Sequence, residues 1–455
     1  MRISVIGCGY LGAVHAAGMA SLGHETVGID VDAAKIERLS AGVAPFHEPQ
    51  FDELLHEQLE SGRLTFSTDP AATSEARVHF IGVGTPQQEG SHAADLRYVD
   101  AAVQSLLPNL KPGDLVVGKS TVPVGTARRL RDIVRKAEPE ADLVWNPEFL
   151  REGFAVDDTL HPDRIVIGVA DDSEHERTVT VLDEVYRRIL DEDTPRLIVG
   201  LETAELVKVA ANSFLATKIS FINAMAEVCE TAGGDVAELA DAIGLDERIG
   251  RRFLNAGLGF GGGCLPKDIR AFQARADELG TGESLAFLAD VDAINSRRRD
   301  RAIALAAEAV GRDESGEPGT LTGVNIAVWG LAFKPNSDDI RDSPSLAVAS
   351  RLIDAGATVK AFDPAANENA TRALPGLNTV ESELDAADDA DVIVLGTEWK
   401  QFREIDPAKV GARVAARNIV DARNCLDREA WADAGWTVRT PGRPIVEPTS
   451  ANASA

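Results

Sequence analysis

Cysteine is scarce in this chain of 455 residues, and long apolar runs are missing. The four cysteines, at positions 8, 229, 264 and 425, form no CxxC pair and follow no regular spacing. This pattern argues against a disulfide framework and a zinc site, and it favours a reducing compartment. No apolar run reaches the length of about 18 residues that a membrane-spanning helix needs. The first residues lack a small-residue cleavage site and predict a strand rather than a signal peptide. We therefore expect a cytoplasmic protein.

Positive charge is also in short supply. The chain has 46 Lys and Arg against 73 Asp and Glu, which gives a formal net charge of -27 and a pI near 4.7. This balance makes nucleic acid and anionic membranes poor partners. The acidic residues are spread along the whole chain, and two interpretations fit: solubility in high salt, or an ordinary acidic surface.

A dinucleotide-binding pattern opens the chain. Residues 2–7 predict a buried strand, the sequence Gly7-Cys8-Gly9-Tyr10-Leu11-Gly12 follows, and a helical stretch runs to about Leu22. In this context Gly7 forms the turn, Gly9 admits a pyrophosphate to the helix N-terminus, and Gly12 packs helix on strand. The alternative is a strand-turn-helix without a cofactor.

The acid at the end of the second strand bears on the choice of cofactor. Residues 25–30 predict this strand, and Asp30 closes it. A carboxylate there binds both hydroxyls of an adenosine ribose, which favours NAD over NADP. Lys35 lies near enough in sequence to keep NADP open.

Polar residues follow the next predicted strands. Strands at 76–83, 115–118 and 143–145 lead into Thr85-Pro86, Thr121 and Glu148. Ligands bind at the carboxyl ends of strands in a doubly wound sheet, so Thr121 and Glu148 are site candidates, with turn chemistry as the alternative for either alone. Residues 113–120 also match the phosphate-loop pattern GxxxxGK[ST], but residues 115–117 look like the strand itself, which argues against an ATP site.

Residues 201–232 predict one long helix, rich in apolar residues and free of proline. Lys208 and Asn212 project from the same face of this helix, because they are four residues apart. Polar groups among alanines are costly unless they have partners, so they suggest a site; a solvated helix edge is the alternative.

A glycine-rich segment, residues 257–263, ends at Cys264 and is followed by Lys267 and Asp268. Glycines let backbone approach a ligand closely, and a nearby cation favours the thiolate that acts as a nucleophile. A buried structural cysteine after a flexible turn is the alternative.

A second α/β series begins after a polar linker. Strand-like runs recur at residues 325–330, 358–362, 391–395 and 418–420. Its first turn reads Gly330-Leu-Ala-Phe-Lys334-Pro, a degenerate glycine turn. Lys334, Arg341 and Arg423 lie near its strand ends and offer positive charge for phosphates.

Several long motifs in order carry a family resemblance. They are GCGYLG at 7–12, STVPVGT at 120–126, NPEFLREG at 146–153, AELVKVAANSF at 204–214, FGGGCLPKD at 260–268 and GLAFKPNSDDIRDSPS at 330–345. Over about residues 1–440 the chain resembles the nucleotide-sugar 6-dehydrogenases, the UDP-glucose/GDP-mannose dehydrogenase family. The resemblance implies oxidation of a sugar C6 alcohol to a carboxylate with two NAD, through a Cys264 thiohemiacetal and thioester.

The resemblance also implies roles for individual residues. Lys208 and Asn212 would stabilise the oxyanions at C6, Asp268 and Thr121 would position the hydrolytic water, and Glu148 would assist hydrolysis. The implied NAD contacts are Gly7, Gly9, Tyr10, Leu11, Gly12, Asp30, Lys35, Thr85, Pro86, Thr121 and Arg341. The implied contacts of the nucleotide sugar are Phe149, Leu150, Arg151, Glu152, Lys208, Asn212, Arg248, Phe253, Leu254, Gly257, Phe260, Gly261, Phe333, Lys334 and Arg423. No metal is implied.

Oligomeric state and substrate follow from the same resemblance. Arg248 would reach the site of a neighbouring subunit, which implies a homodimer or a larger homo-oligomer. Lys267-Asp268 argues against N-acetylated sugars, and residues 332–345 look more like the UDP-glucose type than the GDP-mannose type. One departure is Gly263, where the family commonly has Ser. A single-step hydroxy-acid-type NAD dehydrogenase and a catalytically silent nucleotide-sugar-binding protein remain as alternatives.

The expected fold class is α/β, with two Rossmann-like doubly wound domains joined by a helical middle domain. The expected domains are an NAD-binding domain over 1–200, the helical domain with the cysteine loop and a dimer interface over 201–310, a linker over 311–323, a nucleotide-sugar-binding domain over 324–440 and a disordered tail over 441–455.

Overall fold

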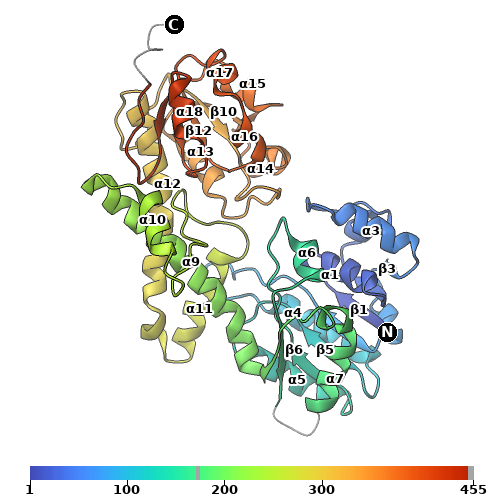
Figure 1. The fold of residues 1–455 in the computed structure, drawn as a ribbon. Coiled ribbons are helices and arrows are strands. Elements are labelled where there is room, and N and C mark those ends of the chain that lie inside the picture. The colour runs from blue at the N-terminus through green and yellow to red at the C-terminus, as the bar shows by residue number, and fades with distance from the viewer. Residues whose placement is uncertain (171–174, 449–455) are drawn as a thin grey trace. The chain divides into compact units, whose positions relative to one another are not determined.

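A computed structural model describes residues 1–170 and 175–448 of the chain. It confirms the predicted fold class, with two parallel-sheet Rossmann-like parts and a helical middle region (Figure 1). The chain forms two compact units, which divide the middle region. The first unit comprises residues 1–211 and 270–283, and the second comprises residues 212–269 and the chain from 284 onward.

The sheet of the first unit has the strand order β3-β2-β1-β4-β5-β6-β7-β8. All neighbouring strands are parallel except β6 and β7. The strands are β1 (Arg2–Ile6), β2 (Glu25–Ile29), β3 (Leu64–Ser67), β4 (Val78–Ile81), β5 (Leu115–Gly118), β6 (Asp142–Trp145), β7 (Ile165–Val169) and β8 (Arg196–Gly200). Strand β5 occupies the middle of the phosphate-loop pattern, as predicted, so those residues form no loop around a phosphate.

Helices cover both faces of this sheet. On one face α1 is buried along residues 12–20, because its Ala- and Gly-rich sequence lets it pack closely in the core. The other face is covered by α4 and α5, together with Leu201 and Ala204. The helical segments of this part are α1 (Tyr10–Ser21), α2 (Ala33–Ser40), α3 (Phe51–Glu60), η1 (Pro70–Glu75), α4 (Arg97–Leu106), η2 (Leu107–Asn109), α5 (Thr126–Ala137), α6 (Ala155–Leu160), α7 (His175–Val185) and α8 (Arg187–Leu190).

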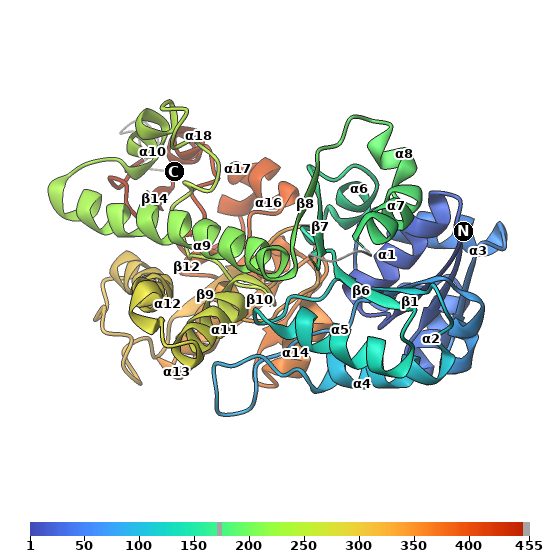
Figure 2. The ribbon, with the colours of Figure 1, turned by 90° about the horizontal axis from the view of Figure 1, so that it is seen from below.

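The long helix predicted over 201–232 is confirmed as α9 (Leu201–Ala232), which Figure 2 shows as one uninterrupted helix. The helical segments that follow are α10 (Val236–Gly244), α11 (Leu265–Glu278), η3 (Gly282–Leu285) and α12 (Phe287–Ala309). Three apolar side chains recur every seven residues on α9 and are exposed: Phe214 by 67%, Phe221 by 49% and Val228 by 56%. A repeat of seven keeps them on one helix face.

The sheet of the second unit is parallel, with the order β11-β10-β9-β12-β13-β14. Its strands are β9 (Asn325–Trp329), β10 (Thr358–Phe362), β11 (Asn378–Thr379), β12 (Val392–Leu395), β13 (Asn418–Asp421) and β14 (Thr437–Arg439). Its helices are α13 (Pro344–Asp354), α14 (Asn367–Ala373), α15 (Glu383–Ala387), α16 (Lys400–Glu404), α17 (Pro407–Gly411) and α18 (Arg428–Asp433). Trp329, Phe402 and Trp431 form an aromatic cluster in its core.

Residues 441–448 differ from the disordered tail expected from the sequence. The backbone N–H of Gly442 donates to Glu230 Oε1 at 2.7 Å, and Val446 forms an antiparallel bridge with Val438. These contacts supply the partners that a free tail would lack, which explains the difference. The rest of the expected tail, 449–455, lies outside the described residues.

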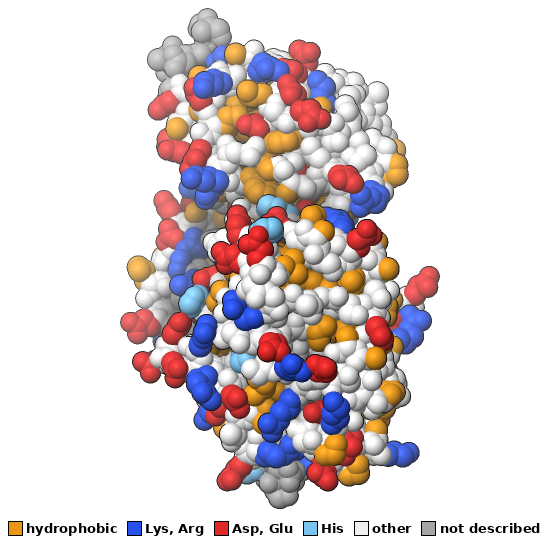
Figure 3. Space-filling view, turned by 90° about the vertical axis from the view of Figure 1, so that its right-hand side faces the viewer, with side chains coloured by type: hydrophobic (Ala, Val, Ile, Leu, Met, Phe, Trp, Pro, Cys, Tyr) orange, Lys and Arg blue, Asp and Glu red, His pale blue; other side chains and the backbone are white. Residues whose placement is uncertain are grey.

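Charge is distributed as the sequence indicated. On the face shown in Figure 3, acidic and basic side chains are interspersed. Within the described part of the chain, no helix combines the length and apolarity that a bilayer span requires.

A buried carboxylate joins α9 to the start of α5. Glu205 accepts hydrogen bonds from the backbone N–H groups of Gly125 at 2.8 Å and Ala127 at 2.7 Å. The first N–H groups of a helix have no partner within the helix, so Glu205 satisfies two donors that would otherwise be buried without acceptors.

We expect Glu205→Ala to lower the free energy of unfolding by about 2 kcal/mol, because two buried donors lose their acceptors. Glu202→Ala is the matched control, since Glu202 is on the same helix but forms a partly exposed ion pair with Arg128. Its loss should stay below about 1 kcal/mol. Urea unfolding of both variants measures the difference, and equal losses would contradict this role of Glu205.

Candidate active site

The turn between β1 and α1 has the geometry that a dinucleotide requires. Gly7 has a φ of +92°, and a Cβ there would lie 2.5 Å from Val83 Cγ1. A Cβ on Gly12 would overlap the carbonyl oxygen of Gly7, so helix and strand meet there without a side chain. A Cβ on Gly9 would have no neighbour within 4 Å. The backbone at Gly9 is therefore open to a pyrophosphate at the start of α1, where no side chain caps the helix.

Asp30 lies at the end of β2 beside this turn. Its carboxylate accepts hydrogen bonds from Cys8 N at 2.8 Å, Asp32 N at 3.0 Å and Lys35 Nζ at 2.8 Å. The carboxylate is thus fixed where a ribose would bind, and its charge disfavours a 2′-phosphate. Lys35, which kept NADP open, is paired with Asp30. The residues present fit NAD.

The polar residues after β4 and β5 come together, as their places at neighbouring strand ends predict. The Thr85 hydroxyl donates to the carbonyl of Thr121 at 2.7 Å. Pro86 accepts a backbone hydrogen bond from Asp95 N at 2.7 Å. Leu11 lies in the first turn of α1.

Glu48 links the cofactor turn to the segment after β6, and no sequence pattern had indicated this residue. Its buried carboxylate accepts hydrogen bonds from Gly153 N at 2.6 Å, Ala155 N at 2.7 Å and the Tyr10 hydroxyl. Burial, and then the hydrogen bond to Glu48, raise the pKa of Tyr10. Because these contacts join residues more than 100 positions apart, no local pattern reveals them.

A buried ion pair joins the end of β6 to α9. Lys208 Nζ lies 3.0 Å from Glu148 Oε1, and both side chains are largely buried. The other oxygen of Glu148 accepts from Leu150 N at 2.6 Å. The Phe149 ring lies 5.7 Å from Lys208 Nζ. The structure thus brings together two residues that the sequence singled out separately.

The neighbouring residues of this segment have other partners. Arg151 forms an ion pair with Asp158 at 2.5 Å. Glu152 is half-buried. Their predicted contacts with a nucleotide sugar stay predictions.

In the second unit, Asp268 is the centre of a polar cluster. Its side chain is buried, and its Oδ2 accepts from Asn212 Nδ2 at 2.6 Å. Its Oδ1 lies 2.6 Å from Lys267 Nζ. Lys267, which the sequence left without a role, therefore holds the carboxylate of Asp268 in place. Asn212 is one turn after Lys208 on α9.

Cys264 stands at the start of α11. Its carbonyl accepts the hydrogen bond of Asp268 N at 2.9 Å, so the cysteine directly precedes the helix, and it is exposed. The positive end of a helix favours an anionic thiolate. An exposed thiol at such an end differs from the buried structural cysteine that was the alternative interpretation.

The glycines before Cys264 pack against the protein itself rather than leaving space for a ligand. A Cβ on Gly257, Gly259, Gly261 or Gly262 would come closer than 3.0 Å to Ala422, Asn295, Asp342 or Phe333, respectively. Phe260 is fixed by a reciprocal pair of hydrogen bonds with the Asn295 side chain, at 2.7 and 2.9 Å. The backbone of residues 257–263 is therefore held in one conformation, which fixes the position of Cys264.

Arg423 and Arg341 brace this segment. The guanidinium of Arg423 donates to the carbonyls of Gly396 at 2.7 Å, Gly259 at 3.0 Å and Phe333 at 3.2 Å. Arg341 pairs with Asp339, and its guanidinium occupies the space where a side chain on residue 263 would lie. This contact gives a physical reason for glycine at position 263.

The remaining residues predicted to contact the nucleotide sugar range from buried to highly exposed. Arg248 pairs with Asp246 and its side chain is 89% exposed, as a residue reaching outward would be. Leu254 is buried, whereas Phe253 is 39% exposed. Lys334 lies over the Phe333 ring at 5.2 Å.

The first turn of the second sheet resembles the cofactor turn, but its acidic side chain is already occupied by hydrogen bonds within the protein. Asp363 follows β10, as Asp30 follows β2. Its carboxylate accepts from four backbone N–H groups, those of residues 331, 332, 365 and 366, and from the Trp399 indole at 3.1 Å. With its acceptors so used, Asp363 is unsuited to bind a ribose as Asp30 can.

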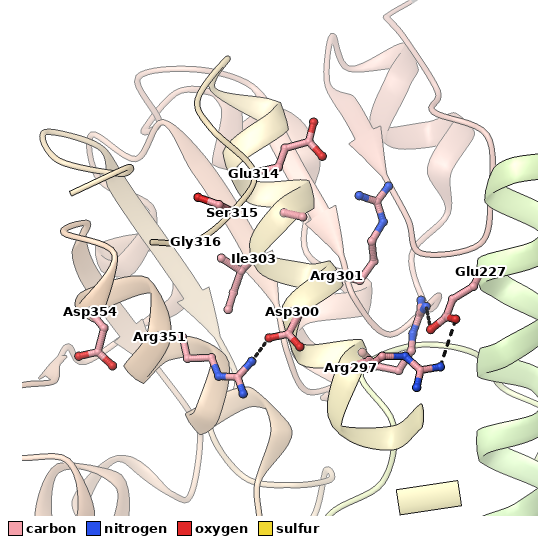
Figure 4. Close-up of a pocket in the computed structure, with 12 residues that line it drawn as sticks. Glu227, Arg297, Asp300, Arg301, Ile303, Glu314, Ser315, Gly316, Arg351 and Asp354 are labelled. Carbon is pink, nitrogen blue, oxygen red and sulfur yellow. Dashed lines mark hydrogen bonds and ion pairs between the residues drawn. The ribbon is translucent and has the colours of Figure 1, made fainter. Parts of the chain in front are cut away.

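A separate cleft of about 550 Å³ lies in the second unit, lined by α9, α12, α13 and residues 314–316 (Figure 4). Its four arginines are paired with acids: Arg351 with Asp300, Arg297 with Glu227, Arg301 with Glu230, and Arg298 with both Glu227 and Glu230 at 3.7 Å. Paired guanidiniums offer a phosphate little net attraction, so we assign this cleft no part in the site.

Family models match the chain in three consecutive parts. Residues 1–190 match the NAD binding domain of the UDP-glucose/GDP-mannose dehydrogenase family, residues 202–297 its central domain, and residues 327–428 its UDP binding domain. The glycine turn and Asp30 lie in the first part, and Cys264 lies in the second.

Relatives match over the full length. The chain is 42% identical over 448 residues to a UDP-glucose 6-dehydrogenase of Rhizobium meliloti, covering 98% of this chain and 100% of that protein. It is 39% identical to a UDP-glucose 6-dehydrogenase of Pseudomonas aeruginosa, covering 98% of each. Among solved structures, it resembles a UDP-glucose dehydrogenase from the hyperthermophilic archaeon Pyrobaculum islandicum with a TM-score of 0.85 and 38% identity, covering 97% of this chain and 98% of that one.

We expect Asp30→Asn to lower kcat/KM for NAD about tenfold and to raise the use of NADP relative to NAD, because the charge that repels a 2′-phosphate is removed. The change also leaves Lys35 without its carboxylate partner. In Asp30→Asn combined with Lys35→Met, the gain with NADP should disappear. Steady-state kinetics with both cofactors test this, and an unchanged NADP/NAD ratio would contradict the role of Asp30.

Proposed function

This chain belongs to the UDP-glucose/GDP-mannose dehydrogenase family and is an NAD-dependent nucleotide-sugar dehydrogenase, and we propose that it oxidises UDP-glucose to UDP-glucuronate. The observation that carries the proposal is full-length identity of 42% and 39% to proteins named UDP-glucose 6-dehydrogenase. The sequence Cys264-Leu-Pro-Lys267-Asp268 argues against N-acetylated sugars as substrates, and it is shared by the UDP-glucose and GDP-mannose types. The product would serve reactions that build polysaccharides.

The Gly7–Gly12 turn and Asp30 would hold NAD, which would supply the hydride acceptor for both oxidations. In the first oxidation the C6 alcohol would lose a hydride to the cofactor and a proton to water, and so become an aldehyde. Negative charge grows on the C6 oxygen as the proton leaves. Lys208 and Asn212, one turn apart on α9, would stabilise that charge as preorganised donors. The pairing of Lys208 with Glu148 supports this role, because it fixes the ammonium before substrate binds.

Cys264 would carry the second oxidation. Its thiolate adds to the aldehyde carbon, and the oxygen takes up a proton to give a thiohemiacetal. Loss of a second hydride and that proton gives a thioester, which water cleaves to the carboxylate and the thiol. Asp268 and Thr121 would position the water, with Glu148 assisting. The place of Cys264 at the start of α11 supports the thiolate.

We also propose a homodimer or a larger homo-oligomer. The exposed stripe of Phe214, Phe221 and Val228 supports it, because regularly spaced apolar side chains on one helix face are typical of helix–helix interfaces. The exposed Arg248 is suited to reach a neighbouring copy. Cytoplasmic location and the predicted domain limits stay predictions.

With UDP-glucose and NAD, we expect two NADH per sugar and a kcat/KM at least about tenfold higher than with GDP-mannose or UDP-N-acetylated sugars. NADH absorbance with product analysis measures both quantities. One NADH per sugar would indicate a single-step dehydrogenase, none would indicate a binding protein, and a higher kcat/KM with GDP-mannose would refute the proposed substrate. Repeating the series across KCl concentrations tests the high-salt interpretation of the acidic composition, which full activity in dilute buffer would contradict.

Cys264→Ser should lower the rate of UDP-glucuronate formation by about a thousandfold or more, because the oxygen nucleophile is not activated as the thiolate is. A partly oxidised sugar should accumulate on the variant. Cys229→Ala, a buried cysteine of the same unit, is the control and should keep the wild-type rate. Unimpaired uronate production by Cys264→Ser would overturn the covalent mechanism.

A further inference from the structure

Lys119 is a buried cation to which the proposed mechanism gives no role. It directly follows β5 and is 8% exposed. Its ammonium donates to Asn146 Oδ1 at 3.0 Å and to the Tyr186 hydroxyl at 3.4 Å, and it lies 5.8 Å from the ring of Phe80. Among the described residues, no carboxylate lies within 4.0 Å of it. A buried lysine whose hydrogen-bond partners are both neutral is costly, which favours a functional role.

The partner of Lys119 is itself immobilised. Asn146 Oδ1 also accepts from the Tyr186 hydroxyl at 2.6 Å, and its Nδ2 donates to the Val166 carbonyl at 2.8 Å. Its backbone N–H donates to the Gly118 carbonyl at 2.8 Å. The side chain therefore has one orientation, with its oxygen toward Lys119.

Asn146 stands two residues before Glu148. The residue between them is Pro147, whose ring fixes φ, so the direction in which the chain leaves β6 follows from the position of Asn146. Glu148 then meets Lys208 at 3.0 Å. A hydrogen bond thus joins Lys119 to Asn146, the backbone through Pro147 joins Asn146 to Glu148, and an ion pair joins Glu148 to Lys208, all within the first unit.

We propose that Lys119 is a positioning residue for the oxidation at C6, because it holds Asn146 and so places the carboxylate of Glu148 that fixes Lys208. The proposal rests on the roles proposed above for Glu148 and Lys208. It assigns to Lys119 no contact with substrate or cofactor.

The charge of Lys119 adds to this effect. Its pKa is lowered to about 8, mainly by burial, with Glu148 opposing the shift and Lys208 adding to it. The other titratable groups facing it are His15 on α1, whose pKa burial and Lys119 hold well below the ordinary value, and Tyr186, whose pKa burial raises. Lys119 is therefore the member of this group that changes charge near pH 8.

The sign of the pH effect follows. Below about pH 8 the ammonium makes a charge-assisted bond to Asn146. Above it, that bond weakens, and with it the support that places Glu148 against Lys208. The rate should therefore fall as pH rises through this range. The depressed pKa also means that the charged form of Lys119 costs stability at neutral pH, a cost that shrinks as pH rises toward the ordinary lysine value.

The test is Lys119→Met in the full chain with UDP-glucose and NAD. We expect kcat to fall about tenfold or more, while the KM values for UDP-glucose and NAD stay within about threefold of wild type. The fall in rate near pH 8, which is the alkaline limb of the pH profile, should disappear. The melting temperature should not fall, because an apolar side chain replaces a buried charge. Tyr186→Phe keeps the charge and should keep the limb.

A fall in rate and melting temperature together, with an unchanged pH profile, would show a merely structural lysine and overturn the proposal, as would an unchanged rate. Asn146→Asp is a second, independent variant. A carboxylate beside Lys119 stabilises its ammonium, so the limb should move to higher pH, and a limb that stays in place refutes the inference. If the wild-type enzyme oxidises a different nucleotide sugar, the proposed substrate is wrong. The inference about Lys119 is then tested by comparing wild type with the Lys119→Met and Asn146→Asp variants on that sugar.

Discussion

The place of Cys264 depends on the close packing of the glycines before it. At residues 257, 259, 261 and 262 the backbone touches neighbouring chain so closely that a Cβ would overlap it. Arg423 adds three hydrogen bonds to carbonyls on and around this path. A nucleophile needs a fixed approach to its target, and rigid backbone supplies it without a side chain of its own. Glycine is flexible in an unfolded chain, but close packing against neighbouring residues restricts these glycines to one conformation.

The two Rossmann-like sheets show how one fold serves two ligands. Each places an acid after the second strand of its first βαβ unit. Asp30 keeps its carboxylate beside an open glycine, whereas Asp363 uses its oxygens on four backbone N–H groups and an indole. The same residue type is therefore available to a ligand in one sheet and an internal brace in the other. The fold alone does not decide between these roles. What decides is whether the carboxylate oxygens are already used by hydrogen bonds within the protein.

Local patterns in the sequence predicted most of the sheets and α9, because buried strands and a long apolar helix leave continuous signals. The pairing of Thr85 with Thr121 followed from strand ends that meet at one edge of a sheet. Contacts between distant positions left no such signal. Glu48 reaches residues 153 and 155, and Lys119 reaches Asn146 and Tyr186. Strands β7 and β8 were not predicted either, although β7 is a buried apolar run and β8 contains the apolar residues 197–199. Such short runs do not by themselves distinguish a strand from a buried helical segment.

An acidic protein that binds an anion must keep its cations where the surface charge has little effect. Lys119 and Lys208 are both buried, and Arg423 is nearly so. Interactions among buried groups are screened far less by salt than those among exposed charges. The net charge of -27 therefore acts mainly on the surface, whereas the ammonium groups act at short range on groups fixed beside them. Such a separation lets the surface composition vary without disturbing the electrostatics around Glu148.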